Sequence, residues 1–319
     1  MVTQSQRRFA AFAWSVLVFN ILVIIWGAYV RASFSGDGCG AHWPFCNGDV
    51  IPHAAATKTI VEFTHRVMTG LDTPLVIGLV IWAFSVYPRA HTVRRHSVLT
   101  LIFLVIEALL GAGLVLFRYV ASDASVGRAI YLSAHLTNTL LLLSALTITA
   151  WLASTGADRL LFGSAPALVK GALPVALLVC ITGGIAALGD TLFPATSLTA
   201  GMQQDFSNAS SMLLRLRMVH PVIAILGAAY LLWAAVGTLQ SGSSSGPSRT
   251  AATRVLTVTL LQVFIGTLNI ALLAPVWMQL IHLLMADALW ITVLLIVLES
   301  ASAPRAITMS APNVRTAAV

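Results

Sequence analysis

Eight apolar stretches of about 20 residues recur along the chain, and they constrain its fold more than any other feature. A helix of that length spans the hydrocarbon core of a bilayer. Only 9% of the 319 residues are charged, whereas soluble domains carry about 25%. The sequence therefore predicts an all-α integral membrane protein. The expected spans are residues 13–33, 60–87, 97–118, 129–153, 168–188, 214–238, 254–273 and 279–300.

The basic residues predict how these spans are oriented. With the N-terminus placed inside, eleven of the 18 Lys and Arg residues fall on inner segments and seven at outer ends. This asymmetry favours a multi-pass protein of the cell membrane with cytoplasmic N- and C-termini. It also accounts for the net charge of +7, so we expect no nucleic-acid partner. We expect no cleaved signal peptide, because the first apolar run is long enough to span.

Several landmarks repeat with a period of four spans. Glu107 and Gly111 in the third span align with Gln262 and Gly266 in the seventh. The end of the first span, "GAYVRASFSGDGCGAHWP", aligns with that of the fifth, "GGIAALGDTLFP". Because four is even, both halves enter the membrane in the same direction, which predicts two pseudo-symmetric four-helix bundles. The expected domains are residues 1–153 and 154–319.

One histidine lies near the start of each even-numbered span. Each is a few residues into its span, roughly 5–10 Å below the outer interface. A lone membrane histidine is often only hydrogen-bonded across helices. Zinc favours three or four clustered ligands, and copper favours Met or Cys beside His. Two histidines per bundle fit the axial ligands of a haem iron better. The four are His65, His135, His220 and His282.

Small residues and cysteines add two open questions. Gly111, Gly113 and Gly266 allow either close helix packing or the approach of a flat macrocycle. Cys39 and Cys46 lie in the first outer loop, where an oxidising compartment favours a disulfide. That disulfide can be a structural staple or can exchange with a thiol carrier.

The motifs of the chain resemble those of the haem A synthases of bacteria and mitochondria. They are "CGAHWPFCNG", "EFTHR", "HLTNT", "RMVHP" and "IHLLMADALW", with the E/Q-x-x-x-G repeats. The resemblance covers essentially the whole chain. It implies an oxidoreductase that converts a ring methyl of haem O to the formyl group of haem A. Some members carry a second cysteine pair in the loop between spans five and six, and this sequence has none there.

The resemblance also implies a division of labour and a set of partners. The N-terminal bundle would hold the substrate haem near His65 and His135, and the C-terminal bundle a haem b between His220 and His282. The implied partners are haem O, the farnesyltransferase that forms it, and terminal oxidase assembly proteins. The electron acceptor stays unknown, because no flavin, nicotinamide or iron–sulfur motif is visible. The source of the formyl oxygen stays open as well.

Three charged residues near the histidines are candidates for the site. Glu62 lies one turn from His65, so it could accept a proton or activate a water as the catalytic residue. Alternatively, Thr59 and Glu62 form a capping box at the start of the helix. Arg66 and Arg217 could bind the haem propionates, or could snorkel toward lipid phosphates.

Two other functions use the same four histidines. A dihaem electron-transfer cytochrome would alter neither haem, and a haem carrier or assembly factor would bind haem without chemistry. Glu62 favours the enzyme, because the second half has no acid one turn outward from its histidine.

Overall fold

The computed structural model describes residues 2–53, 56–207, 212–242 and 244–301. Within these ranges the chain is helical, without a strand, and eight helices are long and apolar enough to cross a membrane. The all-α membrane fold is therefore confirmed. The long helices are α1 (Gln4–Ala32), α2 (Thr57–Val86), α3 (Thr92–Leu116), α4 (Val126–Thr155), α6 (Ala172–Leu192), α8 (Met212–Gln240), α9 (Gly246–Ala271) and α10 (Val276–Ala301). Short helices are η1 (Phe162–Ser164), α5 (Ala167–Lys170), which directly precedes α6, and α7 (Leu198–Phe206).

Most of the long helices begin before the apolar runs that predicted them, whereas α6 begins after the predicted residue 168. Helix α1 starts at Gln4 and α9 at Gly246, well upstream of the predicted residues 13 and 254. Polar side chains stop each helix at its true start: Thr3 accepts from the backbone N–H of Gln6, and Ser245 accepts from that of Ser248. Such caps satisfy amide groups that the first turn leaves unpaired, so a helix extends into the polar flank of its apolar segment.

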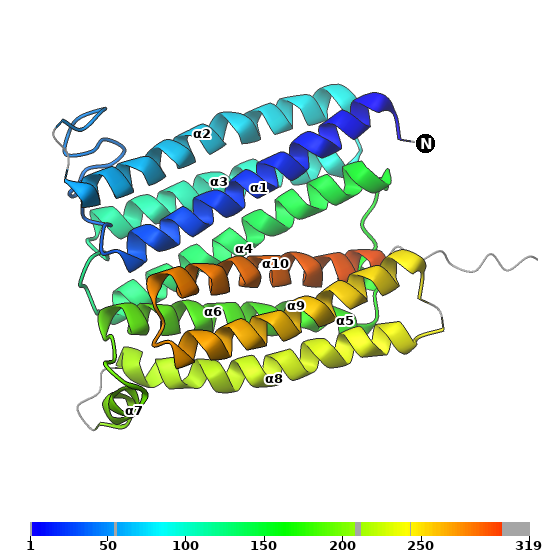
Figure 1. Cartoon of the computed structure of the whole chain (residues 1–319). Coiled ribbons are helices and arrows are strands. Elements are labelled where there is room, and N and C mark those ends of the chain that lie inside the picture. The colour runs from blue at the N-terminus through cyan, green and yellow to red at the C-terminus, as the bar shows by residue number, and fades with distance from the viewer. Residues whose placement is uncertain (1, 54–55, 208–211, 243, 302–319) are drawn as a thin grey trace, which may run out of the picture.

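The helices pack mainly with their neighbours in sequence (Figure 1). Helix α1 lies against α2 and α4, and α3 packs on α4. In the second half α6 packs on α8, α8 on α9, and α9 on α10. Helices α2, α4, α8 and α10 all start at one end of the molecule, and the N-terminus lies at the other (Figure 1).

Helices α4 and α10 meet at the centre and join the two halves. Leu143, Leu146 and Val293 are fully buried in one cluster that draws on both helices. The indole N–H of Trp290 donates to the Leu140 carbonyl at 2.9 Å. Because lipid tails are as apolar as leucine, close packing and such hydrogen bonds stabilise this contact. The halves thus share a core, and the division at residue 153 stays a prediction.

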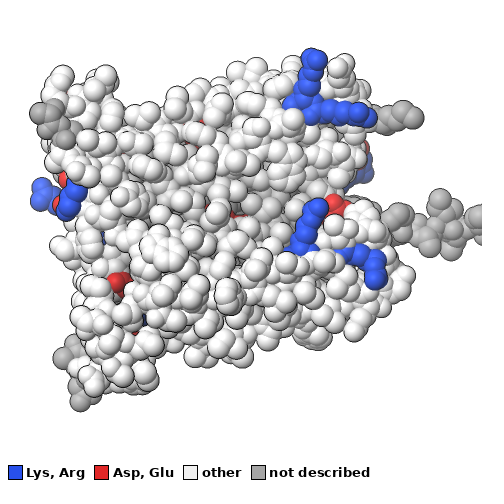
Figure 2. Space-filling view, viewed as in Figure 1, with Lys and Arg blue, Asp and Glu red and all other residues white. Residues whose placement is uncertain are grey.

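The exposed Lys and Arg side chains in this view lie at the two ends of the molecule (Figure 2). In this view the middle of the surface is almost free of charge, and Lys and Arg gather at the end that carries the N-terminus. An uncharged belt between charged ends suits a protein embedded in a bilayer. The chain is a multi-pass membrane protein, and the side that each end faces stays a prediction.

Candidate functional site

The four histidines occupy matching places in the fold. Each lies between the seventh and the tenth residue of its helix, in α2, α4, α8 and α10. At about 1.5 Å per residue this is about 9–14 Å from the start of the helix. These helices begin a few residues earlier than predicted, so the histidines lie deeper along them, still near a common level. They are His65, His135, His220 and His282.

A glycine on the preceding long helix faces each histidine ring. The pairs are Gly27 with His65, Gly111 with His135, Gly183 with His220 and Gly266 with His282. An added Cβ would lie 2.9 Å from Cε1 at Gly266, 3.0 Å at Gly27 and 3.9 Å at Gly111. The sequence identified Gly111 and Gly266 but not the other two. The absence of a Cβ lets the ring and the facing backbone approach closely.

The structure brings the histidines together in the two expected pairs. His65 and His135 are electrostatic neighbours, and so are His220 and His282. The Nδ1 atoms of His65, His135 and His282 are buried and make no hydrogen bond within the described part of the chain. Nδ1 of His220 lies 3.1 Å from the Thr182 hydroxyl.

Among the described residues, a carboxylate lies beside the first pair and not beside the second. Oε1 of Glu107 is 3.2 Å from Nδ1 of His135, close enough for an ion pair but not aligned as a hydrogen bond. In the second half Gln262 donates to the backbone carbonyl of His282 instead, at 3.2 Å. The alignment of Glu107 with Gln262 was predicted, but the contact with the histidine ring was not.

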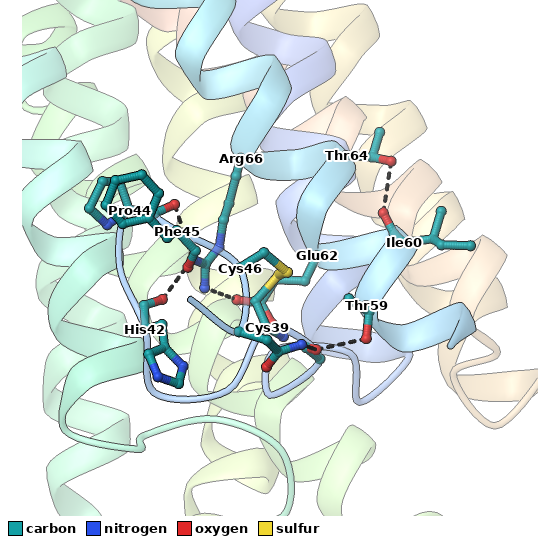
Figure 3. Close-up of a disulfide and its surroundings, with 12 residues drawn as sticks. Cys39, His42, Pro44, Phe45, Cys46, Thr59, Ile60, Glu62, Thr64 and Arg66 are labelled. Carbon is teal, nitrogen blue, oxygen red and sulfur yellow. Dashed lines mark hydrogen bonds and ion pairs between the residues drawn. A yellow bond between two sulfur atoms is a disulfide. The ribbon is translucent and has the colours of Figure 1, made fainter. Parts of the chain in front are cut away.

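Glu62 is buried and holds the first connecting loop (Figure 3). Its Oε2 accepts from the backbone N–H of Cys39 at 2.8 Å, and its Oε1 accepts from Arg66. Thr59 donates its hydroxyl to the Gly38 carbonyl at 2.7 Å. The capping-box interpretation is therefore wrong, because α2 begins at Thr57 and Thr59 already lies inside the helix.

Cys39 and Cys46 form the predicted disulfide, which closes this loop. Both cysteines are fully buried, so an external thiol reaches them only if the loop opens. Figure 3 shows the disulfide beside Glu62, where the loop meets α2. This burial favours the structural staple.

The guanidinium of Arg66 points into the same loop (Figure 3). It donates to the carbonyls of His42 and Phe45, each at 2.7 Å, and forms an ion pair with Glu62. The guanidinium of Arg66 is therefore already bound to groups of the protein itself. A contact with a propionate would add to them or replace them.

Arg217 is engaged in a similar way at the start of α8. It donates to Asp205 of α7 at 2.5 Å and lies 3.3 Å from Asp190 of α6. It also donates to the Phe193 carbonyl at 3.2 Å. The sequence did not predict α7, which lies outside the apolar segments, or the ion pairs of these aspartates, which form only once the chain folds back onto α8.

Arg31 joins the two halves near the same end. It donates to the Ala187 carbonyl and the Thr191 hydroxyl of α6, each at 2.8 Å, and to Gln279 of α10 at 3.3 Å. A partly buried guanidinium needs such partners, because charge without them is costly inside a membrane. The sequence had placed Arg31 only at an outer end.

Comparison with known proteins identifies the family of this chain. The model of the family COX15-CtaA, described as cytochrome oxidase assembly protein, matches residues 10–294. The chain belongs to this family. The membership confirms the resemblance to haem A synthases.

Two kinds of named relative are similar to this chain. A "Protoheme IX farnesyltransferase" of Thermus thermophilus is 43% identical over 295 residues, which is 91% of this chain and 48% of the relative. A "Heme A synthase" of an Exiguobacterium species is 37% identical over 118 residues, 37% of this chain and 38% of the relative. One from Halalkalibacterium halodurans is 41% identical over 97 residues, 30% and 33% of the two chains. The chain thus spans about half the length of the Thermus relative.

Proposed function

We propose that this protein is a haem A synthase, which oxidises a ring methyl of haem O to the formyl group of haem A. The family and the relatives named heme A synthase support this activity. The observation that carries it is the unequal surroundings of two histidine pairs. The first pair has Glu107 beside a ring, whereas the described residues place no carboxylate beside the rings of the second.

The residues of each pair suit the axial ligation of a haem iron. The partly buried imidazoles are electrostatic neighbours in pairs, and a glycine backbone lies against each ring. His65 and His135 would hold the substrate haem O, and His220 and His282 would hold haem b. Bound haem b supplies electron transfer.

Glu62 would serve the oxidation as a fixed proton acceptor. Its carboxylate is held by the Cys39 amide and by Arg66, one turn from His65 on the same helix. A buried carboxylate held in this way can take a proton from the carbon that is oxidised. Arg66 and Arg217 would meet the propionates only by extending or exchanging their present contacts. The four electrons of a methyl-to-formyl oxidation pass to an acceptor that the sequence does not identify.

The test is the pigment content of the purified protein after co-expression with a source of haem O. Haem A, or its hydroxylated precursor, beside haem b is the expected result. Haem b alone, with no conversion of haem O, would indicate a dihaem electron-transfer cytochrome. Haem O bound and recovered unchanged, without haem b, would indicate a carrier.

The partners follow from the proposed reaction. The Thermus relative is named for a farnesyltransferase and is about twice as long as its matching region. This supports an association of the present chain with the enzyme that forms haem O. The family description supports a place in terminal oxidase assembly.

The proposed orientation places both termini in the cytoplasm of a cell. The Lys and Arg side chains at the end that carries the N-terminus support it (Figure 2). Reporter fusions after residues 92 and 245 should read cytoplasmic, and a fusion at residue 48 should read external. An external signal at residue 245 would reverse the orientation.

A further inference from the structure

The motif "HLTNT" holds a carboxylate against its own histidine. Asn138 donates to Oε2 of Glu107 at 2.6 Å, and the hydroxyl of Thr139 donates to Oε1. Asn138 also donates to the Phe103 carbonyl at 2.9 Å, which fixes the amide against α3. Helix α4 thus uses the residues three and four positions after His135 to hold Glu107 of α3 in place.

The held carboxylate lies at the edge of the imidazole. Its Oε1 is 3.2 Å from Nδ1 of His135, and this Nδ1 has no other partner among the described residues. The facing Gly111 leaves ordinary contact distance, 3.9 Å, between an added Cβ and the ring. The ring therefore has the space to turn its Nδ1–H onto the carboxylate.

The second half carries a natural contrast at the same place. Gln262 occupies the position of Glu107, and Gly266 that of Gly111. The Gln262 amide donates to the backbone of His282, while its Oε1 and the Nδ1 of His282 are both buried without a hydrogen bond in the described structure. Among the residues that the structure describes, this histidine has no carboxylate partner.

We propose that Glu107 is a positioning residue that orients His135 and strengthens it as an iron ligand, a role that Gln262 does not play for His282. A carboxylate that accepts from the second ring nitrogen fixes the tautomer and makes the ligating nitrogen more basic. A more basic ligand favours ferric over ferrous iron. The N-terminal site thus binds ferric haem more tightly and has a lower reduction potential than it would with an amide. This rests on the proposed function only in that His135 ligates a haem.

The experiment exchanges the two side chains in the full-length protein. Glu107→Gln, in a His282→Ala background that leaves one histidine pair, is titrated with ferric protohaem IX as the probe. We expect affinity to fall by about 10- to 100-fold, the usual effect of losing such a partner. The midpoint potential of the bound haem should rise. Asn138→Ala, which loosens the carboxylate without removing it, should shift both in the same direction by less.

The reciprocal variant, Gln262→Glu in otherwise wild-type protein, should lower the midpoint potential of the haem at His282. A merely structural role for Glu107 does not predict this shift. Unchanged affinity and potential in Glu107→Gln would overturn the proposal, and so would an unchanged potential in Gln262→Glu. If Glu107→Gln does not fold, Gln262→Glu decides alone. A wild-type protein that binds haem but forms no haem A would overturn the proposed function and leave these measurements valid.

Discussion

The chain segment beside the first histidine is held in place by different contacts in the two halves of the molecule. In the first, Arg66 and the single carboxylate of Glu62 bind a loop that a disulfide also closes. In the second, Arg217 binds two carboxylates, Asp190 and Asp205, and the sequence has no cysteine pair there. One half therefore uses a covalent link where the other uses a second ion pair. Each arginine also stabilises a segment of its own half, so neither is a free site for an anion.

Loss of Arg217 should have the largest effect. Arg217→Gln leaves Asp190 and Asp205, whose side chains are mostly buried, without their shared cation. Removing one partner of a buried ion pair costs about 3–5 kcal/mol. We expect the cost to lie at the upper end of this range. The haem b spectrum should therefore be lost at a lower temperature than in the wild type. Asp205→Asn, which removes one carboxylate, is the matched control and should cost less. Equal melting of wild type and Arg217→Gln would contradict this.

Loss of Glu62 should be nearly as severe but confined to the first half. Glu62→Gln removes the counter-ion of Arg66 and leaves a single amide oxygen for both the Cys39 N–H and the guanidinium, at a local cost of about 3–5 kcal/mol. We expect faster proteolysis of the loop and loss of product, with the haem b spectrum retained. Thr59→Val, which removes only a loop contact, separates the roles. If Thr59→Val abolishes product to the same extent, Glu62 acts through the loop alone.

The disulfide should matter less than the ion pair beside it. Cys39→Ser with Cys46→Ser removes a short closed loop, worth about 2–3 kcal/mol in chain entropy. Because Glu62 and Thr59 still hold the loop, the fold and the haem b spectrum should survive, and activity should fall only in part. Complete loss of activity, with thiol and disulfide forms alternating during turnover by alkylation mass shifts, would instead support a redox relay.

The glycines offer the smallest and most selective comparison. Alanine at Gly266 would bring its Cβ to 2.9 Å from His282, whereas alanine at Gly111 would leave 3.9 Å to His135. Overpacking of this kind costs about 1–3 kcal/mol. Gly266→Ala should therefore perturb the haem b spectrum, and Gly111→Ala should leave ferric haem binding at the first site close to wild type. The reverse order would show that the bound state rearranges these rings.

The sequence predicted the features that follow from a repeated pattern. Apolar length located the eight spans, and the four-span period located His65, His135, His220 and His282. It predicted the disulfide from cysteine spacing and compartment. These features depend on residues whose type alone is informative.

The sequence could not predict contacts that depend on where a helix starts or how a loop folds back. Thr59 and Glu62 have the spacing of a capping box, but α2 begins two residues before Thr59 and the loop takes both side chains as anchors. The hydrogen bond between Asn138 of α4 and Glu107 of α3 could not be predicted for a related reason. Residues 31 positions apart, such as Glu107 and Asn138, meet only once two helices have packed.

The central claim is that the two halves use similar histidine pairs for different purposes, and four single variants test it most directly. Each of His65→Ala, His135→Ala, His220→Ala and His282→Ala is purified after co-expression with a source of haem O, and its absorbance spectrum and extracted haems are compared with those of the wild type. The account predicts that the first two form no haem A but keep a low-spin haem b, and that the last two lose this haem b. The same spectral loss in all four variants would contradict the division of labour.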